Sequence, residues 1–335
     1  MSEQLRPRIA FLLGDPAGVG PEMGVKLLAA GAATQAADVL LIAPPSVLAG
    51  GERIAGASLD VLPVPPGEAL RFEPGRITHL VQPEPAGAAP LGQCSAPAGQ
   101  AVLQALAIAT DLAGAGLVQG IVFAPMNKHS LRLAGMQEED ELRYMQGRFG
   151  VPGFVCEFNI TGRMWTSRVT SHVPLREVAG LITQEAVGQA VHILDGALRR
   201  AGIARPRIAV SGLNPHAGDG GSIGREEIEV IAPAVERLRR DGLDASGPWS
   251  PDTVFIAARR GDFDAVVSMY HDQGQIAMKL MGFEQGVTLH GGLPVPVATS
   301  ASGSAFDIAG RGIARVDGLQ HAFDLCVRMA AQRAA

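Results

Sequence analysis

The stretch Phe263-Asp264-Ala265-Val266-Val267-Ser268-Met269-Tyr270-His271-Asp272-Gln273-Gly274-Gln275-Ile276-Ala277-Met278-Lys279 begins as an apolar strand-like run and continues into a histidine, an acid and a lysine. The same order, a strand and then a histidine in a polar turn, recurs at Thr166–His172 and at Arg207–His216. Ligands of open α/β sheets bind beyond the carboxyl ends of the strands. Three imidazoles in that position, with carboxylates and a lysine nearby, predict a divalent metal site and a bound anion, and therefore an enzyme that acts on a small acid. Histidines that are only hydrogen-bonded at the surface or in the core are the structural alternative.

Strand-like runs alternate with helical segments along the chain. We expect strands at residues 9–13, 39–43, 120–124, 166–170, 207–211 and 265–269, and helices at 21–30, 100–113, 183–201 and from 223 onward. This alternation predicts an α/β sheet. The Pro-, Gly- and Ala-rich residues 44–98 are expected to be ordered but irregular, with a linker as the alternative. A chain of 335 residues has room for two lobes or one large α/β domain.

The composition excludes several classes of protein. Aromatic residues make up 4% and the net charge is -5, which argues against stacking on nucleic acid and against a broad phosphate-binding face. No apolar run is long enough for a membrane span, and the N-terminus lacks a signal-peptide pattern. The three cysteines, Cys94, Cys156 and Cys326, show no disulfide or CxxC spacing. We therefore expect a soluble, cytoplasmic protein.

Lysine is rare in this chain, with three lysines against 25 arginines among the 28 basic residues. Two of them, Lys128 and Lys279, lie inside motif-like segments, where a compact point charge can bind a substrate anion. Chance in an arginine-biased composition is the alternative explanation.

Acidic residues accompany the histidines. Asp272 follows His271, and Asp252 lies in a Ser-Pro-Asp-Thr turn. Either carboxylate could orient a histidine, join a metal or bind substrate hydroxyls; a helix cap or a turn is the structural alternative. A set of three histidines favours zinc, nickel or cobalt, while the carboxylates leave magnesium or manganese open.

Two loops are candidates for binding a nucleotide cofactor. Gly14 to Glu22 is a glycine-rich turn that opens a helix, where free N–H groups favour phosphate. It is neither GxGxxG nor a Walker A loop, so a tight strand–helix turn is the alternative. Ser302 to Gly312 consists of small polar residues that would let adenosine approach the backbone, and a capped helix start is its alternative. The candidate cofactor-binding residues are Gly14, Asp15, Gly18, Gly303, Ser304 and Asp307.

Five motifs together resemble one known family. Gly14–Glu22, Ser171–Leu175, Asn214–Gly218, Tyr270–Gly274 and Gly303–Gly310 are similar to the 4-hydroxythreonine-4-phosphate dehydrogenase family of pyridoxal phosphate synthesis. The order and spacing match from about residue 8 to 330. The last motif also resembles the adenosine-binding loop of isocitrate and isopropylmalate dehydrogenases.

The resemblance implies a two-lobed isocitrate/isopropylmalate dehydrogenase-like fold, with three-layer α/β/α lobes and a cleft between them. The first lobe would comprise residues 1–128 and 291–335, and the second, with the metal site and dimer interface, residues 129–290. The resemblance further implies a homodimer with a shared active site and NAD or NADP as cofactor. It assigns the metal to His172, His216 and His271, with one histidine from the partner subunit, and catalytic positions to Lys279, Asp272 and Asp252.

Departures from the family pattern concern the substrate. Members that act on phosphorylated substrates carry Gly-His-Thr-Glu where this chain has the acidic segment 137–145, and an arginine where it has Ala298. The family asparagine before Gly-Leu-Pro is also lost. Arg143, Arg163 or Arg168 could hold a carboxylate instead.

We therefore expect a metal-dependent, NAD(P)-linked dehydrogenase that oxidises a small hydroxy acid, with decarboxylation as an open second step. Lys128, Arg143 and Lys279 are the expected substrate-binding residues, and zinc is the favoured metal, with magnesium, manganese or cobalt as alternatives. Three other functions stay open: oxidation of 4-phosphohydroxy-L-threonine itself, oxidation of a four-carbon sugar acid or cyclic dihydrodiol carboxylate, and non-catalytic binding.

Overall fold

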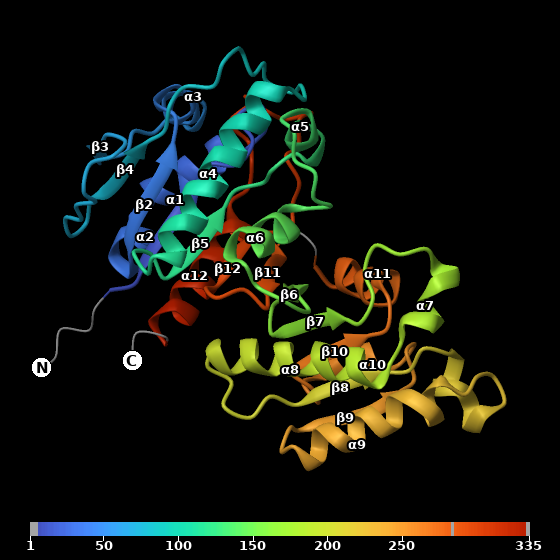
Figure 1. Ribbon diagram of the computed structural model, residues 1–335. Coiled ribbons are helices and arrows are strands. Elements are labelled where there is room, and N and C mark those ends of the chain that lie inside the picture. The colour runs from blue at the N-terminus through green and yellow to red at the C-terminus, as the bar shows by residue number, and fades with distance from the viewer. Residues whose placement is uncertain (1–5, 283–284, 333–335) are drawn as a thin grey trace, which may run out of the picture. The chain divides into compact units, whose positions relative to one another are not determined.

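The computed structural model describes residues 6–282 and 285–332. The chain forms two compact units, one of Met1–Pro152 with Leu293–Ala335 and one of Gly153–Gly292 (Figure 1). The predicted boundary between the lobes lies near residue 128, whereas the first segment of the first unit extends to Pro152. It includes α5 (Lys128–Leu133) and α6 (Glu141–Phe149) because both helices pack against α4 (Ala96–Gly114).

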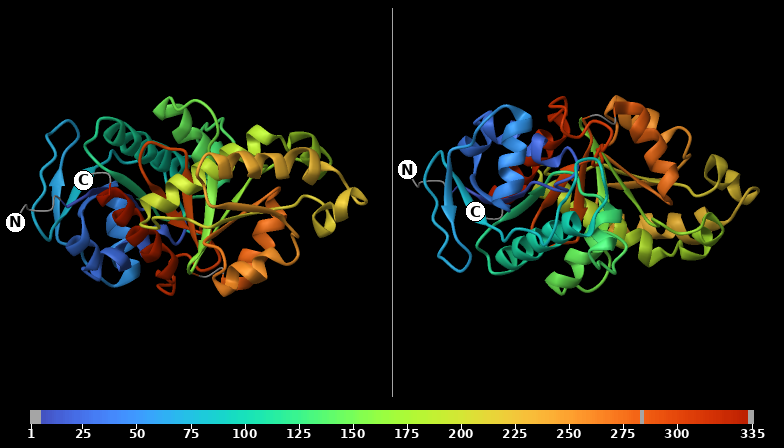
Figure 2. Two further views of the ribbon diagram at one scale, coloured as in Figure 1. Left: turned by 90° about the horizontal axis from the view of Figure 1, so that it is seen from below. Right: turned by 90° about the horizontal axis from the view of Figure 1, so that it is seen from above.

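The first unit is built on a parallel sheet. Its strands are, in spatial order, β3 (Val61–Val64), β4 (Ile77–Val81), β2 (Asp38–Ala43), β1 (Arg8–Leu12), β5 (Gly120–Phe123) and β12 (Val297–Ser300). One face carries α1 (Gly20–Ala29), α2 (Ala32–Ala36), α3 (Pro45–Ala55) and α12 (Asp317–Ala331), and the other carries α4, α5 and α6 (Figure 2). Because both faces are covered, the central strands are continuously apolar and buried.

The second unit has a mixed sheet. Its strands are, in spatial order, β11 (Val287–Gly291), β6 (Cys156–Thr161), β7 (Met164–Arg168), β10 (Ala265–Ser268), β8 (Ile208–Ser211) and β9 (Ala245–Trp249). β11, β6 and β7 pair antiparallel, whereas β7, β10, β8 and β9 are parallel. α8 (Gln184–Arg200) and α9 (Ala232–Arg240) cover one face, and α10 (Val254–Arg260) and α11 (His271–Gly282) cover the other (Figure 2). The short helix α7 (Leu175–Leu181), the 3-10 segment η1 (Pro215–Gly221) and the π-helical segment η2 (Glu227–Ile231) complete the unit.

The alternating strands and helices that the sequence predicts are present, but residues 44–98 are more regular than expected. They contain α3 and the strands β3 and β4. Pro45 lies at the start of α3, where its missing N–H costs nothing, and Gly56 ends the helix with a left-handed φ of 66°. Within the described residues, no helix combines the length and the apolar character that crossing a membrane requires.

Candidate active site

The three candidate histidines follow three neighbouring parallel strands of the second unit. β10 pairs with β7 on one side and with β8 on the other, and all three run in the same direction. The loops that carry His172, His216 and His271 therefore leave the sheet at the same edge. This carboxyl edge is where open α/β sheets bind ligands.

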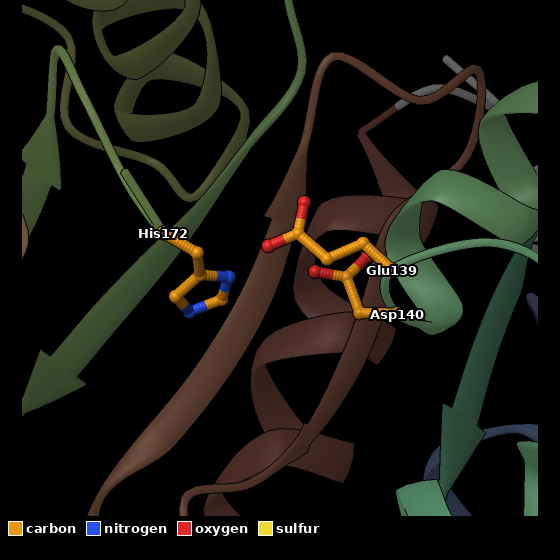
Figure 3. Close-up of side chains that lie close together, drawn as sticks. All are labelled: Glu139, Asp140 and His172. Atoms are coloured by element: carbon orange, nitrogen blue, oxygen red, sulfur yellow. The ribbon is translucent and has the colours of Figure 1, made fainter. Parts of the chain in front are cut away.

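Two of these histidines are neighbours. The ring centroids of His172 and His271 are 5.6 Å apart, a separation that two imidazoles bound to one ion can have, since each zinc–nitrogen bond is about 2.0–2.1 Å. His172 lies in the exposed loop after β7 (Figure 3). The Nδ1 atom of His271 is 2.7 Å from Oδ1 of Asp272, a contact that orients the ring and leaves Nε2 for a ligand.

His216 does not form a three-residue cluster with His172 and His271 within one chain. Among the described residues, no group that contains His216, His172 and His271 has all its ligand atoms within 4.8 Å of one another. The family resemblance divides this set between two subunits, so one chain is not expected to assemble it. The assignment of the three histidines to one metal stays a prediction.

The loop around His216 has an uncommon backbone. His216, Ala217 and Asp219 have φ values of 54°, 52° and 43°, and glycines at 218 and 220 continue the left-handed run. A non-glycine residue in this conformation costs roughly 1–2 kcal/mol, because its Cβ crowds the following carbonyl. Such a run persists only where the surrounding structure holds it.

A buried glutamate, Glu227, supports this loop. Its side chain is 2% exposed, and its Oε1 accepts hydrogen bonds from the backbone N–H of Leu213 at 2.8 Å and of Asn214 at 2.7 Å. Its Oε2 accepts a third from Nδ2 of Asn214 at 3.0 Å. The helix predicted from residue 223 onward includes Glu227, but the sequence did not predict that its carboxylate holds the loop. The only local signal is the pair of glutamates that follows a glycine-rich loop.

The predicted catalytic residues of the second unit are exposed. Asp252 accepts a hydrogen bond from the hydroxyl of Ser250 at 2.6 Å, which is the main reason that its pKa lies below the ordinary value; nearby His216 contributes. Asp272 lies in the first turn of α11, and Lys279 lies in its last turn. All three side chains are accessible to a substrate from solvent.

In the first unit, the two candidate cofactor loops lie against each other. The backbone N–H of Val19 donates to the carbonyl of Ser304 at 3.0 Å, and Nδ2 of Asn127 lies 3.3 Å from the Ser304 hydroxyl. A Cβ on Gly18 would be 2.6 Å from the Ser304 carbonyl. Residues 306–310 form turns, and α12 begins only at Asp317, so the loop with Gly303 and Asp307 does not run directly into a helix.

Asp15 lies inside the glycine-rich turn. Its carboxylate is fully buried and accepts a hydrogen bond from the backbone N–H of Ala17 at 2.8 Å. Burial raises the pKa of Asp15, although the hydrogen bonds from Ala17 and Ser130 oppose the rise. Gly14, with a φ of 73°, allows the turn to approach Pro125, whose carbonyl would be 2.4 Å from a Cβ at that position. The Asp15 side chain thus shapes the turn, and a direct contact with cofactor stays a prediction.

The predicted substrate-binding residues of the first unit lie at helix starts. Lys128 is the first residue of α5 and is exposed. Asp140 caps α6 by accepting a hydrogen bond from the backbone N–H of Arg143 at 2.9 Å, and Figure 3 shows its carboxylate beside that of Glu139. The Arg143 side chain is exposed and donates to Gln146 at 2.9 Å.

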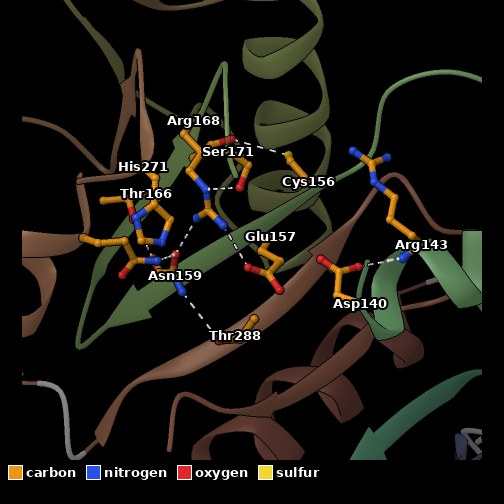
Figure 4. A network of polar contacts seen from close by, with 12 residues as sticks. Asp140, Arg143, Cys156, Glu157, Asn159, Thr166, Arg168, Ser171, His271 and Thr288 are labelled. Carbon is orange, nitrogen blue, oxygen red and sulfur yellow. Dashed lines mark hydrogen bonds and ion pairs between the residues drawn. The ribbon is translucent and has the colours of Figure 1, made fainter. Parts of the chain in front are cut away.

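The guanidinium of Arg168 is buried and hydrogen-bonded to other side chains of the protein. It is 5% exposed, and it donates to Ser171 at 2.9 Å, to Asn159 at 2.9 Å and to Glu157 at 2.8 Å (Figure 4). This buried network argues against Arg168 as an anion site open to substrate. The sequence analysis missed Glu157 and Asn159, although they alternate with apolar residues along β6 as residues of one sheet face do.

Histidine-bearing loops at the carboxyl ends of parallel strands lie where α/β enzymes bind their ligands. Residues 36–326 match the family described as "Pyridoxal phosphate biosynthetic protein PdxA", and the chain belongs to this family. The predicted family relationship is confirmed. The chain is a 4-hydroxythreonine-4-phosphate dehydrogenase-like oxidoreductase, a family membership that implies NAD(P).

Relatives match over nearly the whole chain. The chain is 49% identical over 334 residues to "Putative 4-hydroxythreonine-4-phosphate dehydrogenase 2" of Pseudomonas aeruginosa, covering 98% of both. The crystal structure of 4-hydroxythreonine-4-phosphate dehydrogenase from Klebsiella pneumoniae has 36% identity and a TM-score of 0.81, covering 97% of this chain and 99% of that one. A terephthalate 1,2-cis-dihydrodiol dehydrogenase from Burkholderia xenovorans has 28% identity and a TM-score of 0.69, with coverages of 96% and 98%.

The wider fold class is also confirmed. A β-decarboxylating dehydrogenase from Thermococcus kodakarensis shares the fold at 14% identity and a TM-score of 0.51, covering 95% of this chain and 81% of that one.

Proposed function

We propose that this chain is a metal-dependent, NAD(P)-linked dehydrogenase that oxidises a small hydroxy acid as a homodimer with a shared active site. The observation that carries the proposal is the pairing of His172 and His271 at the carboxyl edge of the sheet, in a chain of this family. Zinc is the favoured metal, because imidazole ligands suit it, and cobalt, manganese and magnesium are the alternatives.

The side chains have distinct proposed roles. His172, His216 and His271 would hold the ion, and a bound divalent ion lowers the pKa of a hydroxyl that it coordinates. Asp272 orients the His271 ring through its 2.7 Å contact. Lys279 would bind the substrate anion or carry a proton. The exposed Asp252 carboxylate, whose pKa is lowered by the hydrogen bond from Ser250, would accept a hydrogen bond from substrate.

The first unit would bind the nicotinamide cofactor. Gly14 to Val19 offers backbone N–H groups at the start of α1, and the loop of Gly303, Ser304 and Asp307 packs on this turn through Ser304. A helix N-terminus of this kind favours a pyrophosphate.

A second copy of the chain would cover exposed apolar side chains of α11 in the second unit. Ile276 and Leu280 lie one turn apart on this helix and are 60% and 84% exposed. Large apolar side chains exposed together on one helix are typical of a protein interface.

Relatives of this chain are named for phosphorylated hydroxy acids, and we propose that this chain departs from them in taking a substrate that carries a carboxylate and no phosphate. The N-terminus of α6 is capped by the carboxylate of Asp140, and Glu139 and Glu141 flank it. Three acidic residues repel a phosphate dianion at the segment where phosphate-binding family members carry His-Thr. Ala298, in place of the family arginine, is fully buried in β12 and offers no cation. The name of the Burkholderia relative, which specifies a dihydrodiol substrate, supports this proposal.

The test is NAD(P)H formation by metal-free protein supplied with zinc, manganese or magnesium. One substrate set contains 4-phosphohydroxy-L-threonine and phosphorylated four-carbon acids, and the other their unphosphorylated counterparts and dihydrodiol carboxylates. We expect turnover with the second set only. Asp140→Ser keeps a helix cap without the charge and should lower the inhibition constant of phosphorylated compounds that compete with the substrate, whereas the exposed Glu138→Gln should leave it unchanged. Turnover restricted to phosphorylated compounds would contradict the substrate proposal.

A further inference from the structure

We infer that Gln273 is a positioning residue that ties together the strand ends carrying the candidate metal ligands. The inference rests on the proposed metal site and identifies the side chain that sets its geometry. Gln273 itself is two residues beyond His271 and does not have to touch metal or substrate.

The side-chain amide of Gln273 bridges two strands with both of its polar atoms. Its Nε2 donates to the carbonyl of Gly212 at 2.9 Å, and its Oε1 accepts from the backbone N–H of Met269 at 2.7 Å. Gly212 directly follows β8 and leads into the His216 loop, and Met269 directly follows β10 and leads to His271. One side chain thus connects the starting points of two histidine loops.

The third histidine loop is attached to the same residue, Met269. Thr170, two residues before His172, donates its hydroxyl to the Met269 carbonyl at 2.8 Å, and its backbone N–H donates to the same oxygen at 3.1 Å. Gln273 therefore holds the N–H of Met269 while Thr170 holds its C=O. All three histidine loops converge on the backbone of this one residue.

The position of Gln273 is itself fixed by packing. Gly274 is buried, and a Cβ there would lie 2.9 Å from the Ser268 hydroxyl, so the start of α11 rests directly on the end of β10. Gly212 is held from the other side, because its N–H donates to the Trp249 carbonyl at 2.7 Å.

The amide of Gln273 serves both partners at once. The bridge needs a donor toward the Gly212 carbonyl and an acceptor toward the Met269 N–H, and glutamine has both at the required length. Glutamate keeps the acceptor but turns a second oxygen toward a carbonyl, and methionine has neither group. Because a metal site needs its ligands within about 0.5 Å of the productive geometry, loss of the bridge should weaken binding. Changes in groups that orient metal ligands typically cost about 10–100-fold in affinity.

The experiment is a titration of the metal-free, full-length protein with cobalt(II), followed by its visible absorption. We expect Gln273→Met to lower cobalt affinity by about 10–100-fold and to change the absorption bands. Thr170→Val and Gln273→Glu should act in the same direction, and they carry the test should Gln273→Met fail to fold. The control is Gln189→Met, which loses one exposed hydrogen bond to Glu185 on α8 and should bind cobalt as the unsubstituted protein does.

The outcomes separate this inference from the function on which it rests. Affinity and spectrum of Gln273→Met that match the unsubstituted protein would overturn the positioning role, even if the melting temperature fell. Failure of the unsubstituted protein to bind cobalt would overturn the metal proposal and the inference together.

Discussion

The buried carboxylate of Glu227 offers a quantitative test of how the His216 loop is held. In Glu227→Gln, one oxygen stays available for the N–H groups of Leu213 and Asn214, but its charge is lost and Nε2 faces the Asn214 side-chain amide. Rotating the Asn214 side-chain amide by 180° would not remove this contact between two donors without a loss, because its Nδ2 also donates to Glu226 at 2.7 Å.

The expected cost follows from the three hydrogen bonds. Two of them change from charge-assisted to neutral, at about 1 kcal/mol each, and the third, worth about 1.5–3 kcal/mol, is lost. The sum is about 3.5–5 kcal/mol of unfolding free energy. This is a large share of the roughly 5–15 kcal/mol by which proteins are stable.

The measurement is urea unfolding followed by tryptophan fluorescence. Both tryptophans, Trp165 and Trp249, belong to the second unit, so the signal reports the unit that contains the loop. The control Glu229→Gln removes an exposed carboxylate that pairs with Arg225, and it should cost less than about 1 kcal/mol. A Glu227→Gln variant as stable as this control would refute the view that the glutamate holds the left-handed loop.

Three further predictions concern other parts of the molecule. Asp15→Asn should raise the melting temperature at pH 7. Burial raises the pKa of Asp15, so the folding stability that the protonated carboxyl provides below its unfolded-state pKa is lost as pH rises through the folded-state pKa. The difference in melting temperature between the variant and the unsubstituted protein should therefore shrink toward pH 4, and a difference that stays constant would contradict this prediction. Gly18→Ala places a Cβ 2.6 Å from the Ser304 carbonyl and should raise the KM for NAD(P) more than it lowers kcat; an unchanged cofactor KM in steady-state kinetics would show that the two loops need not touch. Leu280→Glu should shift the protein from dimer to monomer in analytical ultracentrifugation, because the side chain is 84% exposed and a charge there opposes burial against a second copy; a dimer of unchanged affinity would place the interface elsewhere.

The strands and their histidines could be predicted because the signals are local. An apolar run followed by a polar turn is visible in the sequence at His172, His216 and His271, and parallel strands between covered faces need such runs. The cofactor loops were recognisable for a similar reason, since small residues cluster at Gly14–Gly20 and Ser302–Ser304.

The supports of the site could not be predicted, because they depend on residues far apart in the chain. Gln273 bonds to Gly212 across 61 positions, and nothing near either residue indicates the contact. His216 and Ala217 adopt a left-handed backbone that their own preferences oppose, and only the buried Glu227 explains why it persists. The helix α3 was missed because its prolines suggested irregular structure, although proline is favoured in a first turn.

The discontinuity of the first unit bears on how a newly made chain can fold. The second unit is a single continuous segment, Gly153–Gly292, so all of it is synthesised before the last part of the first unit is made. β12 pairs with β5, and α12 packs against both strands, yet these elements lie in the final segment, Leu293–Ala335. β5 therefore presents an open edge, with one apolar face uncovered, until Leu293–Ala335 has been made. Because unpaired edges and exposed apolar surface promote association with other chains, the first unit is the one exposed to aggregation during this interval.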